Sequence, residues 1–302
     1  MQKTAALPWP DALLALVVMA VWGSNFVVMR IGLEHLPPLL FAALRFAFVF
    51  IPAGAFFKRP QTAWWHVAAF GLLIGVGQFG VLFIALRSSI SPGLASLVVQ
   101  SQVFFTIALS MALTGERVRG HQWLALALAI AGLGVILAHP GKGVATPLGL
   151  ALTLFAGLSW AGGNTVVRYS GRVDILAYVV WSGLYATPPL ILLSLAFEGW
   201  PAIRAGLAHA DAATWAAVLW QSVGNSLFGY AAWGWLLARH PAATVAPTAL
   251  LVPVFGMAAS AFWLAEPLPA WKLAAAGLIM SGLALNLIWP SVHAALSGKR
   301  LA

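Results

Sequence analysis

Long apolar stretches follow one another along almost the whole 302-residue chain, and short polar connections separate them. A helix needs about 20 mostly apolar residues to cross the hydrocarbon core of a bilayer. Ten stretches meet this requirement, and they run over residues 11–29, 38–57, 64–86, 92–114, 121–139, 147–169, 175–197, 214–238, 242–265 and 270–290. Glycine, proline and charged residues mark most boundaries between them. The pattern therefore predicts an all-α integral membrane protein with ten transmembrane helices.

The composition agrees with a membrane location. Apolar residues make up 62% of the chain, while Asp, Glu, Lys and Arg together make up only 8%. Soluble domains carry about 25% charged residues, so this composition excludes an ordinary soluble enzyme. It also excludes a disordered chain, because disordered chains are poor in apolar residues. The lipid bilayer is therefore the first partner that we expect.

The net charge of +9 comes from 16 Lys and Arg against 7 Asp and Glu. The basic residues occur singly or in pairs between apolar stretches, whereas a nucleic-acid binder would cluster them, so no nucleic-acid partner is expected. If the N-terminus is cytoplasmic, about ten Lys and Arg lie on the cytoplasmic side and about five on the other. This bias predicts that both termini are cytoplasmic.

The two halves of the sequence resemble each other. At an offset of 150 residues, the matched pairs are Trp65 and Trp215, Phe105 and Phe255, Glu116 and Glu266, Gly132 and Gly282, and Pro140 and Pro290. Each half holds five helices, an odd number, so a tandem copy must insert in the opposite sense. The chain is therefore predicted to contain two inverted five-helix repeats, 1–142 and 143–302, an architecture that characterises secondary transporters.

Ionisable side chains avoid the middle of the predicted helices, with Arg45 as the exception. A carboxylate at the bilayer centre costs about 2.5–3.5 kcal/mol, so it is kept there only for a role. The sequence holds no metal-ligand cluster, carboxylate pair or nucleophile motif, and we therefore expect neither an enzyme nor a cofactor or metal. Without a buried carboxylate to couple protons, uniport is expected. Arg45 itself is expected to extend outward to the interface, the alternative being a pairing with a substrate carboxylate or a helix C-terminus.

Neutral polar side chains do occur near the middle of several predicted helices. At this depth they must find partners within the bundle or in a water-filled cavity. A single amide is explained equally well by hydrogen bonding between helices. The whole set, spread over five helices, favours a shared cavity. The candidate substrate-binding residues among them are Asn25, Gln78, Gln100, Ser101, Asn164, Gln221 and Asn225.

Tryptophan gives a second indication, because the chain holds 15. Many lie near segment ends, where the aromatic belt of membrane proteins explains them. Trp22 and Trp160 lie mid-segment and match at a second offset between the halves, 138 residues, which also relates Arg30 to Arg168. Trp233 follows the polar residues of the eighth helix. Core packing or lipid contact is the simpler explanation for each ring alone. Beside a polar cavity, such rings can stack on an aromatic substrate or face an ammonium group, at about 0.5–2 kcal/mol per contact.

Short motifs punctuate the chain in a fixed order. They are Trp22-Gly23-Ser24-Asn25-Phe26, Pro37-Pro38, Arg45-Phe46, Ala85-Leu86-Arg87, Ser91-Pro92, Glu116-Arg117, Gly132-Leu133-Gly134-Val135 and Leu264-Ala265-Glu266. In this arrangement the chain resembles the EamA type of the drug/metabolite transporter superfamily, and within it the YddG-type aromatic amino acid exporters. The resemblance implies ten helices in inverted repeats, a bacterial inner-membrane location and export of small metabolites. Many relatives carry a proline late in the fourth helix, where this chain has Gln102-Val103, which leaves the bending of that helix open.

These observations predict an exporter of amino acids, aromatic ones above all, and of related small metabolites, working by alternating access. The amides would bind the zwitterion, and Trp22, Trp160 and Trp233 would bind the side chain. Small molecules and lipid are the partners expected, and ten helices suffice to enclose a path within one chain. A multidrug or organic-cation exporter and a nucleotide-sugar transporter of the same superfamily are the alternatives. The latter should need several basic residues in its cavity to bind phosphate.

Overall fold

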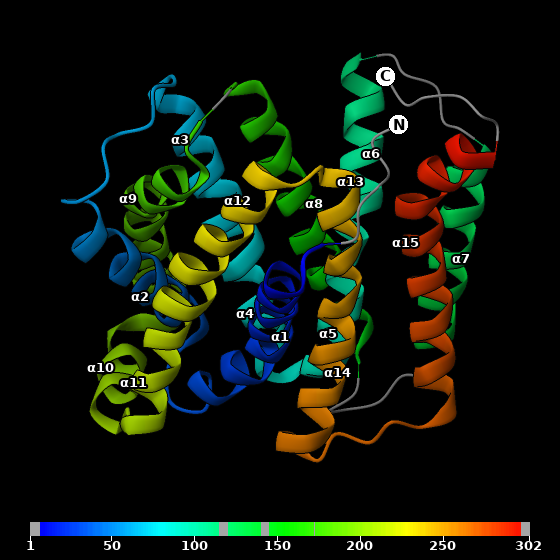
Figure 1. Cartoon of the computed structure of the whole chain (residues 1–302). Coiled ribbons are helices and arrows are strands. Elements are labelled where there is room, and N and C mark those ends of the chain that lie inside the picture. The colour runs from blue at the N-terminus through cyan, green and yellow to red at the C-terminus, as the bar shows by residue number, and fades with distance from the viewer. Residues whose placement is uncertain (1–6, 115–119, 140–144, 172, 297–302) are drawn as a thin grey trace.

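The computed structural model describes residues 7–114, 120–139, 145–171 and 173–296. Over these residues the chain is helical, apart from short connections and one isolated β-bridge between Ile90 and Ala145. Figure 1 shows the helices standing side by side as one bundle. The Glu116-Arg117 motif and Pro140, used above for the family resemblance and the repeat, lie outside the described residues.

The helices form ten segments that follow the ten predicted crossings. Segments 1 to 5 are α1 (Trp9–Gly32), α2 (Pro38–Ala53), α3-η1-α4 (Trp64–Gly71, Leu72–Gly80, Val81–Ser88), α5-η2-α6 (Pro92–Val98, Val99–Ser101, Gln102–Thr114) and α7 (Gly120–Leu137). Segments 6 to 10 are α8 (Pro147–Tyr169), α9-η3 (Ile175–Leu193, Ser194–Glu198), α11-η4-α12 (Ala212–Leu219, Trp220–Phe228, Gly229–Arg239), α13-η5-α14 (Ala242–Val245, Ala246–Leu250, Leu251–Leu264) and α15 (Ala270–Leu296). The short helix α10 (Gly199–His209) continues from segment 7.

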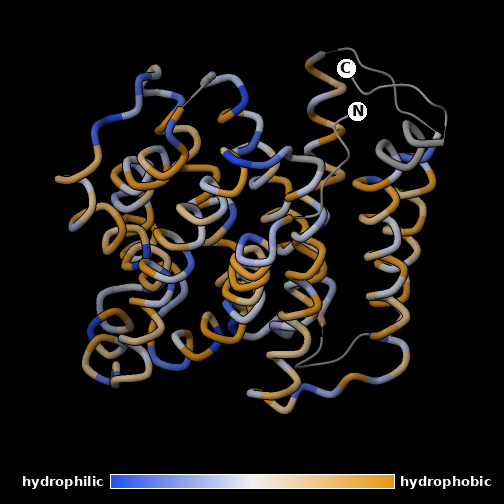
Figure 2. Tube along the Cα trace, viewed as in Figure 1, coloured by the Kyte–Doolittle hydropathy of each residue, from blue (hydrophilic) through white to orange (hydrophobic). Residues whose placement is uncertain are grey.

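Length and hydropathy support membrane crossings by these segments. Eight of them contain helices long and apolar enough to span a bilayer, and α2 is a shorter apolar helix. Segment 8 is less apolar because Gln221, Ser222, Asn225 and Ser226 lie together in η4. Figure 2 shows apolar residues along the helices and hydrophilic ones gathered mainly in the connections at both ends of the bundle. The predicted all-α, ten-helix membrane fold is confirmed.

Irregular turns interrupt the helices at corresponding places in the two halves. The π-helical stretches η1 and η4 begin at Leu72 and Trp220, and the 3-10 stretches η2 and η5 end at Ser101 and Leu250, so both pairs are separated by close to the repeat offset of 150. Short π-helical insertions in helices frequently mark functional sites. The η2 stretch also answers the question left by the missing proline, because segment 4 changes its winding there without one.

Glycines let the helices approach closely. A Cβ added to Gly23 in α1 would lie 2.5 Å from Phe255 Cβ in α14, and one on Gly132 in α7 would lie 2.6 Å from Ile279 in α15. Small residues at such contacts are the usual means of helix association in membranes. The α7–α15 pair forms one edge of the bundle, on the right of Figure 1. Gly282 meets Ala125 in the same pair, so the repeat-related Gly132 and Gly282 serve a single interface.

Acidic residues at the segment ends bond to helix N-termini, where unpaired N–H groups and the helix dipole favour a carboxylate. Asp174 accepts hydrogen bonds from the first N–H groups of α9, and Asp211 accepts them from Thr214 at the start of α11. Glu198 reaches across from segment 7 to the N–H groups of Leu39 and Leu40 in α2. Glu266 likewise accepts a hydrogen bond from the N–H of Gly93 near the start of α5. Four of the seven acidic residues of the chain therefore have a partner at a helix N-terminus.

A neutral cavity of amides and aromatic rings

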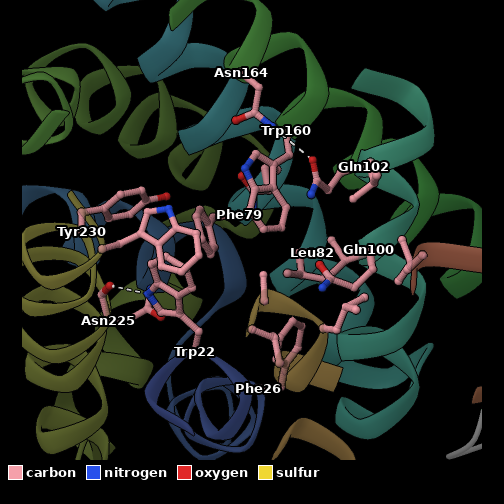
Figure 3. Close-up of a pocket in the computed structure, with 18 of the residues that line it drawn as sticks. Trp22, Phe26, Phe79, Leu82, Gln100, Gln102, Trp160, Asn164, Asn225 and Tyr230 are labelled. Atoms are coloured by element: carbon pink, nitrogen blue, oxygen red, sulfur yellow. Dashed lines mark hydrogen bonds between the residues drawn. The ribbon is translucent and has the colours of Figure 1, made fainter. Parts of the chain in front are cut away.

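A cavity of about 350 Å³ lies in the middle of the bundle (Figure 3). Its walls come from segments 1, 3, 4, 6, 8, 9 and 10, with Ile175 added from the start of segment 7. The polar lining residues are Gln78, Gln100, Gln102, Asn164, Asn225 and Tyr230, and the aromatic ones are Trp22, Phe26, Phe70, Phe79, Trp160, Tyr230 and Trp233. Among the described residues, no Asp, Glu, Lys, Arg or His lines the cavity. The site is therefore electrically neutral at its surface.

Three of the cavity amides are carried by the irregular turns. Gln78 belongs to η1, Gln100 to η2 and Asn225 to η4. Each of these side chains is about 5% exposed, and none forms a hydrogen bond with another described residue. A buried amide without a protein partner has donors and acceptors ready for a ligand or water. These three residues are therefore the best candidates for direct polar contact with a substrate.

The other two amides are paired with each other. Asn164 Nδ2 donates to Gln102 Oε1 at 3.1 Å, which joins α8 to α6, and Figure 3 shows both side chains at the cavity wall. The hydroxyl of Thr106, one turn later in α6, donates to the main-chain carbonyl of Gln102. This pair combines the two roles that sequence considerations left open, because it is interhelical and also lines the cavity.

An aromatic cluster forms the facing wall. The Trp22 ring lies 5.7 Å from Tyr230 and 5.5 Å from Trp233, centroid to centroid, at tilts near 55°. Trp22 Nε1 donates to the main-chain carbonyl of Asn225 at 3.2 Å, which fixes the indole against η4. A Cβ on Gly229 would come 2.3 Å from this Nε1, so the close contact requires glycine there. Figure 3 shows Trp160 entering from α8 on another side of the cavity.

Seven of the ten predicted site residues line this cavity, namely Trp22, Gln78, Gln100, Trp160, Asn164, Asn225 and Trp233. Asn25 and Gln221 do not. They pair with each other between α1 and η4, with Gln221 Nε2 donating to Asn25 Oδ1 at 2.8 Å. Ser101 is also outside the lining, and its hydroxyl packs where a side chain on Gly157 in α8 would lie.

The prediction that Arg45 extends outward to the interface is wrong. Its side chain is 1% exposed and lies inside the bundle. Nη1 donates to Gln221 Oε1 at 2.9 Å and Nη2 donates to Ser226 Oγ at 3.1 Å. Acceptors from η4 are available within reach of α2, so the guanidinium does not need to reach water. This contact also explains why Gln221, and through it Asn25, face away from the cavity.

Several lining residues were not predicted from the sequence. Gln102 adjoins the predicted pair Gln100 and Ser101 and follows the 3-10 turn η2, and its side chain lines the cavity. Tyr230 lies five residues after Asn225, just beyond the end of the π-helical stretch η4, and the wider π-helical turn brings residues at this spacing closer to one face. Phe79 follows Gln78 in the same kind of turn. The missing signal is the change of helical period, which hydrophobicity does not reveal.

Over the described residues no group of three or more His, Asp or Glu could hold a metal ion.

The sequence pattern of the EamA-like transporter family matches residues 9–138 and 147–288. The chain is 42% identical over 281 residues to a protein of Salmonella typhimurium named "Probable amino-acid metabolite efflux pump", and 40% identical over 282 residues to one of Escherichia coli with the same name. Each alignment covers 91% of this chain and 94% of the relative. A solved structure titled only "Crystal structure of protein" shares the fold with a TM-score of 0.63 at 21% identity, covering 93% of this chain and 97% of the other. The protein, a multi-pass membrane protein with a central cavity, therefore belongs to the EamA-like transporter family.

Proposed function

We propose that this chain exports amino acids, aromatic ones in preference, and related small metabolites. The observation that carries the proposal is that the unpaired amides of Gln78, Gln100 and Asn225 share a neutral cavity with the cluster of Trp22, Tyr230 and Trp233. The names of the two bacterial relatives support the amino-acid part. The aromatic preference rests on the cavity alone.

The cavity chemistry suits a zwitterion that carries a flat apolar side chain. Once it leaves water, such a molecule needs hydrogen-bond donors for its carboxylate and acceptors for its ammonium group. An amide supplies both kinds of group without a net charge. The aromatic rings offer offset or edge contacts to an aromatic side chain, worth about 0.5–1.5 kcal/mol each beyond their area burial. A volume of about 350 Å³ is within the range of small-molecule sites.

The transport cycle that we propose is alternating access by the two halves, 1–142 and 143–302, moving around this cavity. Both halves contribute lining residues, and the paired π-helical turns η1 and η4 place one amide from each half at the site. Because no carboxylate or imidazole among the described residues lines the cavity, we propose uniport rather than proton coupling. One chain holds the whole cavity, so a monomer suffices.

We place the protein in a bacterial inner membrane with both termini in the cytoplasm. The outer membrane of such bacteria is crossed by β-barrels, which an all-helical bundle is not. The excess of Lys and Arg on the side of the termini supports the orientation. Two single-cysteine variants test the orientation, one with a new cysteine in the connection after α2 and one with a new cysteine in the connection after α1. The measurement is which of the two cysteines reacts with a membrane-impermeant thiol reagent added outside intact cells.

The two alternatives within the superfamily need charges that the cavity lacks. An exporter of organic cations would gain most from a carboxylate in the site, and a nucleotide-sugar transporter would need several Lys or Arg residues for phosphate. Neither type of residue occurs in the described lining.

Counterflow in proteoliposomes tests the proposal. Purified protein is reconstituted with unlabelled compound inside, and uptake of labelled tryptophan, phenylalanine, leucine, a nucleoside and an organic cation is measured. We expect exchange of the amino acids, fastest for the aromatic ones, and little exchange of the nucleoside or the cation. If no amino acid exchanges while the cation does, the organic-cation alternative replaces our proposal.

A further inference from the structure

One charged side chain lies inside the bundle without an opposite charge beside it. Arg45 in α2 is almost fully buried, and none of the ion pairs formed by the described residues includes it. Arginine side chains stay protonated in proteins. Charges at this depth are rare and expensive, and they are kept for a role. Arg45 is therefore a buried positive charge that no acidic side chain of the described residues neutralises.

The hydrogen bonds of Arg45 lower the cost of burying it without cancelling its charge. Both side-chain acceptors, Gln221 Oε1 and Ser226 Oγ, are neutral. The third nitrogen, Nε, is buried and has no partner among the described residues. In surroundings of low polarity an uncompensated charge acts over longer distances than it does in water.

The charge lies directly behind the wall of the cavity. The guanidinium carbon of Arg45 is 3.5 Å from the centroid of the Phe79 ring, stacked as a cation–π pair. Phe79 lines the cavity, and so does its neighbour Gln78. The guanidinium is therefore in contact with a ring that also lines the space where a substrate would sit. No charged residue of the described lining screens it.

We propose that Arg45 determines which charge the cavity accepts, by favouring substrates that carry a carboxylate and rejecting organic cations without touching either. A zwitterion can turn its carboxylate toward the Phe79 wall and place its ammonium group farther away, at the amides. A cation that lacks the carboxylate meets only the unfavourable part of this field, which is selection by repulsion. The inference rests on the proposed export of amino acids. It adds a physical reason why the cavity would reject amines that lack a carboxylate.

A purely structural role for Arg45 makes a different prediction. If Arg45 only joined α2 to η4, replacing it would lower stability and transport of every substrate together, and the preference between differently charged substrates would not change. Charge preference is therefore the quantity to measure, because it is a ratio within one variant and does not depend on how much folded protein is present.

The experiment is competition against labelled tryptophan counterflow by tryptamine, which lacks the carboxylate and is a cation, and by unlabelled tryptophan. We define the tryptamine ratio as the half-inhibitory concentration of tryptamine divided by that of tryptophan. We expect Arg45→Gln to lower this ratio by about tenfold or more, because the cation is no longer repelled. Arg45→Lys, which keeps the charge, should hold the ratio within about twofold of the wild type.

A second pair of variants leaves Arg45 in place, in case Arg45→Gln does not fold. Ser226→Asp puts a carboxylate where the hydroxyl now accepts from Nη2, and Ser226→Asn is the uncharged variant of the same size. Ser226 does not line the cavity. Ser226→Asp should lower the tryptamine ratio as Arg45→Gln does, and Ser226→Asn should not.

The outcomes separate this proposal from the proposed function. A wild type that exchanges tryptophan, with the same tryptamine ratio in Ser226→Asp and Ser226→Asn, overturns the role of Arg45 and leaves amino-acid export standing. A wild type that exchanges no amino acid overturns export and this inference with it. A lowered ratio in Ser226→Asp alone supports the electrostatic role.

Discussion

Asn25 in α1 and Gln221 in η4 hold each other's side-chain amides, with Gln221 Nε2 donating to Asn25 Oδ1 at 2.8 Å and Asn25 Nδ2 donating back to Gln221 Oε1 at 3.4 Å. The same Gln221 oxygen accepts from Arg45 in α2. One amide oxygen thus joins α1, α2 and segment 8. The two residues therefore belong to the framework that places the cavity, and neither is among the residues that line it.

This relationship predicts unequal costs for the two partners. Gln221→Leu leaves a buried guanidinium short of an acceptor, and we expect a loss of stability of about 2–3 kcal/mol. Asn25→Leu leaves the Arg45 contact intact and should cost about 1 kcal/mol. Thermal unfolding of the purified variants in detergent measures the difference. Equal shifts of the midpoint would contradict the network.

The cavity amides should show the opposite behaviour. Asn225→Ala removes a side-chain amide that has no side-chain partner in the described protein. The stability of the variant should therefore stay within about 0.5 kcal/mol of the wild type. The KM for the amino acid should rise about tenfold or more, because one hydrogen bond to a charged group is lost. Initial rates of counterflow at varied substrate concentration give the KM.

Asn164→Ala is the matched comparison, because Asn164 also lines the cavity but is bonded to Gln102. It should lower stability by about 1 kcal/mol in addition to any effect on KM. If Asn225→Ala lowers stability as much as Asn164→Ala and leaves the KM unchanged, then Asn225 is a packing residue.

Gly229 should control the aromatic preference through Trp22. A methyl group at this position would occupy the space of Trp22 Nε1, so Gly229→Ala must displace the indole from the carbonyl of Asn225. We expect exchange of tryptophan and phenylalanine to fall at least fivefold relative to leucine, about the worth of one lost aromatic contact. The measurement is the ratio of the rates for the three substrates.

Gly134→Ala is the control for this substitution, because a Cβ on Gly134 in α7 meets nothing within 4 Å. It should leave both the rates and their ratio as in the wild type. An unchanged ratio in Gly229→Ala, at normal folding, would remove Trp22 from the aromatic subsite.

Most of the fold could be predicted from the sequence because bilayer thickness and backbone hydrogen bonding leave few alternatives to long apolar helices. The cavity was located for the same reason, since polar side chains such as Gln78 and Asn225 cannot face lipid. Segment ends were less predictable. The stretch expected to end at 197 continues through a π-helical turn and Gly199, with φ of 80°, into α10.

The differences between the predicted site and the observed cavity lining have two physical origins. An amide near the middle of a segment can bond to a substrate or to a buried side chain, and the sequence does not say which. For Gln221 the deciding partner is Arg45, 176 residues away in the chain, and that contact exists only after folding. The period of the helix is the second, because the π-helical turns η1 and η4 change which residues share a face, and hydropathy does not reveal this change.

Glu266 should make stability depend on pH on the acid side. It lies in the connection between α14 and α15, where its carboxylate accepts hydrogen bonds from Ser91, Ser260 and Lys272. Burial alone would raise the pKa of Glu266, but the bonds from Lys272, Ser260 and Ser91 outweigh it and hold the pKa below its ordinary value of 4.5.

A group whose pKa is lowered on folding stabilises the folded state above the ordinary value, and the contribution is lost as the pH falls through the folded pKa. Thermal unfolding in detergent between about pH 7 and pH 3 should therefore show a steeper loss of stability for the wild type than for Glu266→Gln. The variant should be less stable near neutral pH, and the two curves should approach each other in acid. Glu34→Gln, at an exposed acid between α1 and α2, should follow the wild type. Parallel curves for the wild type and Glu266→Gln would mean that Glu266 is not held as a carboxylate by these bonds.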